Sequence, residues 1–186
     1  MGPLTAIGNP DGTLPDAARE VRELALLIAP SKIAIGPQAT REFVSTFSDG
    51  VMHFATHGLV NYRKPQSSFL MLAADDHFTA QEIARQVWSD ANLVVLSACN
   101  TGTSSLDTIG HRSLAGAFLK AGAPYVLGTL WPVDDRATRM FMTEFYTAVN
   151  SGQTPEDSLR RAQAKLRDSP DYRHPVYWGG FVLFEV

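Results

Sequence analysis

The chain of 186 residues contains one cysteine, no run of basic residues and no long hydrophobic stretch. A single cysteine cannot form an internal disulfide, so the sequence predicts a reducing, cytoplasmic setting. No apolar stretch reaches the roughly 20 residues of a membrane-spanning helix, and the N-terminus lacks the layout of a signal peptide. The net charge of −3, without a basic run, argues against nucleic acid and anionic membranes as partners.

Two further kinds of site are disfavoured by missing residues. The Gly8–Gly12 turn lacks the Lys and Ser/Thr of a phosphate-binding loop, so we do not expect a nucleotide. His53 and His57 have the spacing of a helical zinc motif, but their segment has the pattern of a strand and no further ligands support a metal. We therefore predict no cofactor, and we expect His53 to be a buried, hydrogen-bonded strand residue.

What the sequence does contain is an alternation of strand-like and helix-like segments, with 45% hydrophobic residues in a length suited to one domain. The strands at 51–55 and 93–98 are nearly continuous apolar runs, which favours a parallel sheet covered on both faces. The expected strands are 4–7, 32–35, 51–55, 69–73, 93–98, 125–130 and 178–186, and the expected helices are 15–28, 40–47, 79–88, 113–121, 135–149 and 155–167. The fold class is therefore α/β.

Two chemically active side chains stand at the ends of apolar strands. Cys99 follows one such strand and precedes a polar turn, and His57 follows another. A lone cysteine is usually a small buried hydrophobe and a lone histidine is usually structural. The strand-end positions favour a functional pair, because sites in open α/β sheets form outside the carboxyl ends of the strands. If the two strands are neighbours, about 5 Å apart, the side chains can share one crevice.

This pair suits acyl transfer by a thiol. Cys99 is the candidate nucleophile and His57 the candidate base, with the backbone N–H groups of Gly58 and Cys99 as the oxyanion hole. No third, orienting carboxylate is evident in the sequence. Asp134, Asp135 and Asp107 are candidates for an acidic wall of the substrate pocket, while Asp134 or Asp135 has the alternative role of capping the next helix.

Together these segments resemble the CHAT domain, the caspase-like domain of bacterial proteins with tetratricopeptide repeats, in the clan of caspases, separases and metacaspases. The matching segments are Leu14–Ile28, His53–Gly58, Leu96–Thr101, Ala117–Ala123, Trp131–Asp135 and His174–Trp178. The resemblance implies a three-layer α/β sandwich, with a mostly parallel central sheet and helices on both faces. It also implies a Cys99–His57 dyad, with oxyanion N–H groups from Gly58 and Cys99.

The resemblance further implies that residues 1–186 are a single CHAT domain, the C-terminal part of a longer protein whose repeats bind a partner. The leading hypothesis is a cysteine endopeptidase that cleaves a protein or peptide substrate under control of an N-terminal repeat region. A latent or non-catalytic binding module and a thiol-dependent acyltransferase remain alternatives. Gly110–Ser113 contains a basic pair where relatives often carry acidic residues, so a preference for basic residues at the cut is not carried over.

Overall fold

A computed structural model describes residues 2–98 and 113–185 of the chain. Its centre is a six-stranded sheet in the order β2-β1-β3-β7-β8-β9. All neighbouring pairs are parallel except β8 and β9, which are antiparallel. The strands are β1 (Leu4–Gly8), β2 (Ser31–Ile35), β3 (Gly50–Ala55), β7 (Ala91–Leu96), β8 (Tyr125–Thr129) and β9 (Phe181–Glu185). The mostly parallel sheet expected from the sequence is confirmed.

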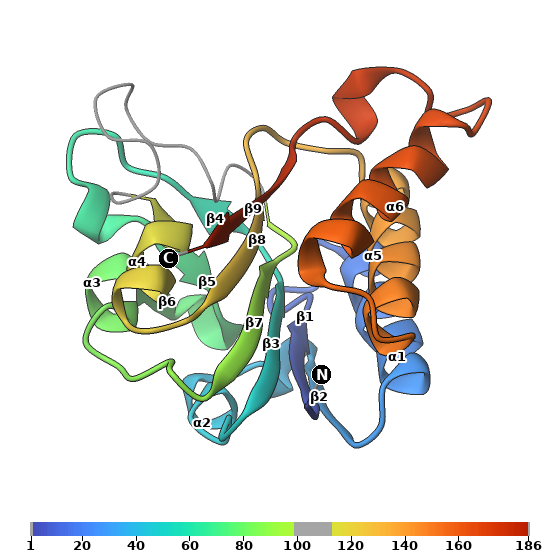
Figure 1. Ribbon diagram of the computed structural model, residues 1–186. Coiled ribbons are helices and arrows are strands. Elements are labelled where there is room, and N and C mark those ends of the chain that lie inside the picture. Colours follow the sequence, from blue (N-terminus) through green and yellow to red (C-terminus); the bar gives the residue numbers. More distant parts are fainter. Residues whose placement is uncertain (1, 99–112, 186) are drawn as a thin grey trace.

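Both faces of this sheet are covered, which makes three layers (Figure 1). One face carries α1 (Pro15–Leu27), α5 (Asp135–Asn150) and α6 (Pro155–Arg167). The other face carries α2 (Arg41–Val44), α3 (Ala80–Ile83), α4 (Leu114–Lys120) and a small antiparallel sheet of β4 (Gly58–Leu59), β5 (Phe69–Met71) and β6 (His77–Thr79). The fold is therefore the α/β sandwich with helices on both faces that the resemblance implied.

The strand β3 explains why the sheet is central. All six of its residues are buried. Met52 and Phe54 belong to the core under α3 and α4, whereas Val51 and Ala55 belong to the core under α1 and α5. Successive side chains of a strand point to opposite faces, so a nearly continuous apolar run supplies both cores at once.

Two helices are shorter than the sequence predicts. Thr40 caps α2 and Thr79 forms a capping box with Glu82 at α3, as the side-chain pattern indicates. The predicted helix 79–88 nevertheless ends at Ile83. Trp88 is 2% exposed, packs edge-on against Phe118 and donates its backbone N–H to the carbonyl of Ala121. The chain leaves the helix after Ile83 because the Trp88 indole packs into the core instead.

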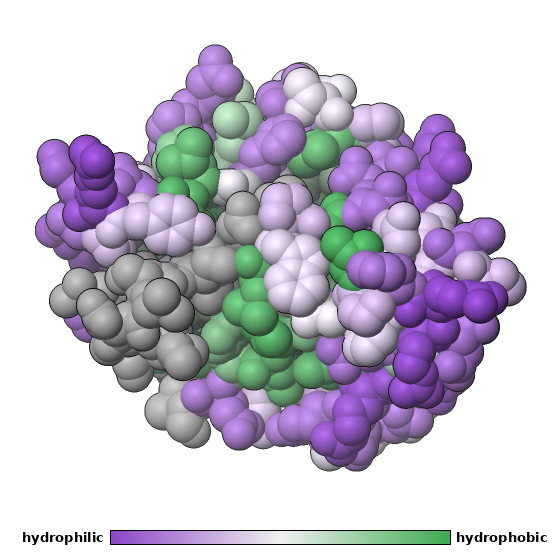
Figure 2. Space-filling model, turned by 90° about the horizontal axis from the view of Figure 1, so that it is seen from above, coloured by the Kyte–Doolittle hydropathy of each residue, from purple (hydrophilic) through white to green (hydrophobic). Residues whose placement is uncertain are grey.

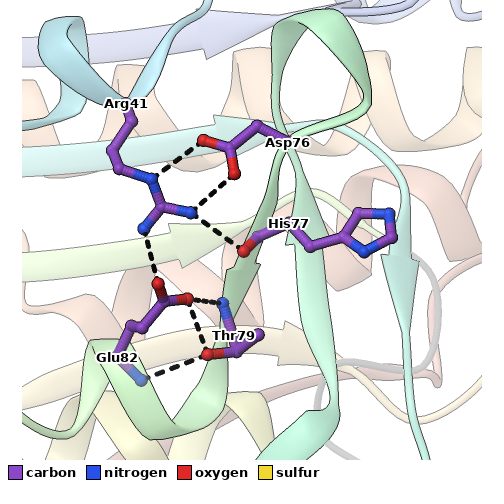
Figure 3. Close-up of polar contacts among 5 residues, drawn as sticks. All are labelled: Arg41, Asp76, His77, Thr79 and Glu82. Carbon is purple, nitrogen blue, oxygen red and sulfur yellow. Dashed lines mark hydrogen bonds and ion pairs between the residues drawn. The ribbon is translucent and has the colours of Figure 1, made fainter.

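A polar cluster connects α2 to the small sheet (Figure 3). The Arg41 guanidinium donates to both carboxylate oxygens of Asp76, at 2.8 and 2.7 Å, and to the carbonyl of His77 at 2.9 Å. It also donates to Glu82 at 3.1 Å, whose other oxygen accepts from Thr79. The bidentate hydrogen bonds from Arg41 lower the pKa of Asp76, so this carboxylate keeps its charge to a lower pH than a free aspartate does.

No helix within residues 2–98 and 113–185 is long and apolar enough to cross a membrane.

Candidate active site

The carboxyl ends of β3 and β7 lie side by side, because these two strands are neighbours in the sheet. Phe54 of β3 is opposite Leu96 of β7. His57 follows β3 after one residue, and the described part of the chain continues past β7 through Ser97 and Ala98. Cys99 itself lies outside the described residues. The expectation that the two strands are neighbours is confirmed.

A cavity of about 80 Å³ opens at this edge of the sheet. His57 and Thr56 line it from the end of β3, and Ser97 and Ala98 line it from the end of β7. Figure 2 views the molecule from this side and shows hydrophobic residues near the centre of the face, with hydrophilic residues along its lower and right-hand rim. The two residues immediately before Cys99 therefore share one cavity wall with His57.

Threonine hydroxyls anchor both strand ends. Thr129, at the end of β8 and 3% exposed, donates its hydroxyl to the carbonyl of Ala98 at 2.8 Å. Thr56 donates its hydroxyl to the carbonyl of Met71 at 2.7 Å, and the carbonyl of His57 accepts the Met71 N–H at 2.9 Å. Each bond satisfies a buried polar group next to a residue of the candidate pair. These contacts hold the backbone on either side of the cavity in place.

The loop after β1 brings a carboxylate and a hydroxyl to His57. Thr13 Oγ1 lies 2.7 Å from His57 Nε2 and 2.9 Å from each carboxylate oxygen of Asp11. Asp11 Oδ2 is 3.6 Å from His57 Nε2. Neither residue was among the sequence candidates, which lacked an orienting carboxylate. We refer to Asp11, Thr13 and His57 as the imidazole relay.

The protons of the imidazole relay can be assigned from its donors and acceptors. Burial raises the pKa of Asp11, but the hydrogen bonds from Thr13 and the attraction of a protonated His57 together lower it by more, so its net pKa is below the ordinary value. An ionised carboxylate only accepts, and a hydroxyl has one proton to give. Thr13 therefore donates to Asp11 and accepts from His57 Nε2–H. This leaves Nδ1 of the neutral ring as the nitrogen that can take a proton.

The backbone explains why this loop reaches His57. Asn9 and Gly12 adopt positive φ angles of 50° and 82°, which reverse the chain after β1. The Asn9 N–H donates to the carbonyl of Ala55 at the end of β3, and its side chain accepts the Leu14 N–H at 2.6 Å. The sequence marked Gly8–Gly12 as a turn. This turn belongs to the site because β1 pairs with β3, and that pairing cannot be recognised from the local sequence.

Of the three aspartates predicted for a pocket wall, the structure describes two, and these two have different roles. Asp134 is the N-cap of α5, where its carboxylate accepts from the N–H groups of Arg136 and Ala137 at 3.0 Å each. Asp135 lines the cavity beside His57. Asp107 lies outside the described residues. The alternative role of helix capping is therefore observed for Asp134.

Asp135 stands in an acidic environment. Burial raises its pKa, and so do the nearby charges of Asp16 and Asp134. Glu20, which also lines the cavity, raises it as well, while His57 lowers it. Carboxylates that repel one another gain stability when a cation binds between them. This side of the cavity is rich in carboxylates.

His53 lies in β3, four residues before His57, and contacts a residue of the cavity wall from the core side. It is 0% exposed, as the sequence predicted, and bridges α1 to α5. Its Nε2 is 2.8 Å from Glu20 Oε1 and its Nδ1 is 2.9 Å from the hydroxyl of Tyr146. Burial raises the pKa of Tyr146 well above its ordinary value, so this phenol stays protonated. The chain Glu20–His53–Tyr146 supports the cavity wall from inside the core.

Gly58 opens β4 directly after His57 and pairs with Leu70 of β5. It is partly exposed at the same edge of the molecule. Because Cys99 lies outside the described residues, the suggested pairing of the Gly58 and Cys99 N–H groups stays a prediction.

Solved structures with a similar fold define the class to which this architecture belongs. A chain of the separase–securin complex of Saccharomyces cerevisiae is 17% identical, with a TM-score of 0.68, and the match covers 98% of this chain and 12% of that one. The Arg-specific cysteine proteinase gingipain R of Porphyromonas gingivalis is 11% identical, with a TM-score of 0.71, and covers 100% of this chain and 46% of that one. The chain thus has the caspase-like fold.

The sequence family is more specific. The CHAT domain family profile matches residues 2–185, so the chain belongs to the CHAT domain family. Tetratricopeptide repeat protein 28 of Mus musculus is 38% identical over 91 residues, and the human protein of the same name is 37% identical over 91 residues. These matches span 49% of this chain and only 4% of either relative.

Proposed function

We propose that this chain is a cysteine endopeptidase domain that acts on a protein substrate through Cys99 and His57. The observation that carries the proposal is the imidazole relay, which orients His57 at the sheet edge where the strand preceding Cys99 ends. A histidine that is oriented by a hydroxyl and a carboxylate, with one ring nitrogen left as acceptor, has the form of a general base. The caspase-like fold of separase and gingipain R supports the same class of activity.

The proposed reaction proceeds in two halves. His57 Nδ1 takes the proton of the Cys99 thiol, and the thiolate forms a bond to the carbonyl carbon of the scissile peptide. The N–H groups of Gly58 and Cys99 stabilise the oxyanion. The C–N bond then breaks as His57 returns the proton to the leaving amine. Water, deprotonated by His57, hydrolyses the thioester and restores the thiol.

We also propose that the residue before the cut is basic. Asp135 and Glu20 line the cavity beside His57 and no cation among the described residues lines it with them. Asp135 is the residue proposed to pair with the substrate's guanidinium or ammonium group, since the carboxylate of Asp134 already caps α5.

Regulation by a repeat region is part of the proposal. The relatives with significant identity are tetratricopeptide repeat proteins, and the matched part is a small share of each. We propose that such repeats, when joined to this domain, present the protein partner and control access to Cys99.

The test combines labelling and cleavage. A peptide electrophile with arginine at the residue before its reactive carbonyl should alkylate Cys99, and a norleucine analogue should react more slowly. Asp135→Asn should reduce this discrimination by about tenfold, because it removes one charge-assisted hydrogen bond. In a cleavage screen of a proteome, the protein should yield fragments that its Cys99→Ala variant does not. Identical fragment sets and an unlabelled Cys99, in the domain and in the longer chain alike, would identify a non-catalytic binding module.

The hydroxyl of Thr13 gives a finer prediction. Thr13→Val keeps the side-chain shape but removes the hydroxyl that lies within hydrogen-bond distance of both Asp11 and His57 Nε2. We expect the alkylation rate of Cys99 to fall about tenfold, a fraction of the 10²–10⁴ that a general base contributes. Thr147→Val is the matched control, since the hydroxyl of Thr147 bonds only within α5. Equal rates in the two variants would remove Thr13 from the mechanism, and thermal unfolding checks that both are folded.

A further inference from the structure

A second depression lies on the face of the molecule that carries α3 and α4. It is a groove of about 660 Å³ between these two helices and the turn around Pro65. It shares no lining residue with the cavity at His57. Arg63, Arg85 and Lys120 line it from three different segments of the chain. We refer to it as the basic groove.

The cations of the basic groove have no acidic partner in the described part of the molecule. All three are exposed, and none takes part in an ion pair among residues 2–98 and 113–185. No acidic residue is among the described residues that line the groove. By contrast, Arg41, on the same side of the sheet, has carboxylates at 2.7 and 3.1 Å. Among residues 2–98 and 113–185, the positive charge here is therefore uncompensated, in a protein whose net charge is −3.

The polar cluster around Arg41 is one reason why the described lining of the groove contains no carboxylate. Glu82 is the acidic residue of α3, and it belongs to the helix that forms one wall. Its two oxygens are held by Arg41 and by Thr79, on the side of α3 that faces α2 and β6 (Figure 3). The hydrogen bonds of Thr79 and the charge of Arg41 outweigh burial and lower the pKa of Glu82, so it remains bound there as an anion. Gln81 and Arg85 face the groove instead.

The lining suits an extended peptide. Ala80, Ala84 and Ala117 make a floor of small apolar side chains, which leaves room for a backbone. Gln66 and Gln81 each offer an amide that donates and accepts, as the free N–H and C=O groups of an extended chain require. The backbone N–H and C=O groups of a helix bond to one another, so a helical ligand would offer these amides no backbone partner.

We propose that the basic groove is a docking site for an extended acidic segment of a partner protein, whose carboxylates pair with Arg63, Arg85 and Lys120. Nucleic acid fits less well, because it demands a larger basic surface than three cations on a molecule of net negative charge. The docking site is separate from the cavity at His57, so binding there does not depend on peptidase activity.

The experiment measures binding of a defined probe by fluorescence anisotropy, in the Cys99→Ala background so that the probe cannot be consumed. The probe is a fluorescein-labelled dodecapeptide of alternating aspartate and serine, which disfavours helix. The combined variant Arg63→Glu, Arg85→Glu, Lys120→Glu should weaken binding about tenfold or more at physiological salt, since several charge pairs are lost together. The milder replacement of all three by glutamine should give an intermediate loss, which guards against misfolding of the first variant.

The matched control carries the same change of charge elsewhere. Lys32→Glu, Lys165→Glu and Arg173→Glu alter exposed cations that do not line the groove. This control should stay within about twofold of the parent protein, because separated surface charges are screened over a Debye length of about 8 Å at physiological salt. Equal losses in the two charge-reversal variants would mean a nonspecific attraction and overturn the proposal. So would an absence of binding by the parent protein, or tighter binding of an oligothymidylate probe than of the peptide.

Discussion

Replacing His57 with alanine is expected to slow the alkylation of Cys99 by a peptide electrophile about 10²–10⁴-fold, the range that a positioned general base contributes. The relay from Asp11 through Thr13 leaves one ring nitrogen of His57 as the acceptor for the thiol proton. Without the ring, the reaction depends on the small fraction of thiolate that a free cysteine has at neutral pH. The rate is measured by mass spectrometry of the modified protein over time.

Two further measurements separate a chemical role of His57 from a structural one. The side chain of His57 is 42% exposed, so added imidazole can reach the space that the alanine variant leaves, and it should restore part of the rate. His174→Ala is the matched control, because His174 is also exposed and lines no part of the cavity. An unchanged rate in His57→Ala, or an equal fall in both variants, would exclude His57 as the base.

The second large effect is on stability. Glu20→Ala is expected to lower the free energy of unfolding by about 3–5 kcal/mol, the usual cost of removing one partner of a buried, potentially ionic pair. Glu20 is 3% exposed and His53 is 0% exposed, and the 2.8 Å contact between them connects α1 to β3. Without the carboxylate, His53 Nε2 stays buried without its hydrogen-bond partner. Urea unfolding followed by circular dichroism measures the difference.

The same helix supplies the control. Glu23→Ala removes a carboxylate that pairs with Arg139 at the surface, where the two side chains are 41% and 35% exposed. Its expected cost is below about 1 kcal/mol. The triple variant Glu20→Leu, His53→Leu, Tyr146→Phe should recover much of the loss, because it replaces all three members of the buried hydrogen-bonded chain with apolar side chains. If Glu20→Ala were no more costly than Glu23→Ala, the buried chain beneath the cavity would not support the fold.

Several parts of the structure could be predicted because they depend on short-range patterns. The apolar runs before His57 and Cys99 indicated buried parallel strands, and β3 and β7 are both found in the centre of the sheet. Side chains that satisfy the first N–H groups of a helix were recognised at Thr40 and Thr79. Helix lengths were less accurate, since the burial of Trp88 against Phe118 is a long-range contact that local propensity does not contain.

The sequence by itself determined the α/β class, the strand ends that carry His57 and Cys99, and the family resemblance, because each is written in neighbouring residues. Only the tertiary structure decided which distant residues serve His57. The strand order places β1 beside β3, and this brings Asp11 and Thr13, 46 and 44 positions away, to one imidazole. The tertiary structure also distinguished the roles of two neighbouring aspartates: Asp135 lines the cavity, whereas Asp134 caps α5. A hydrophobic pattern specifies which side of a strand is buried, but strand order is set by the packing of the whole chain.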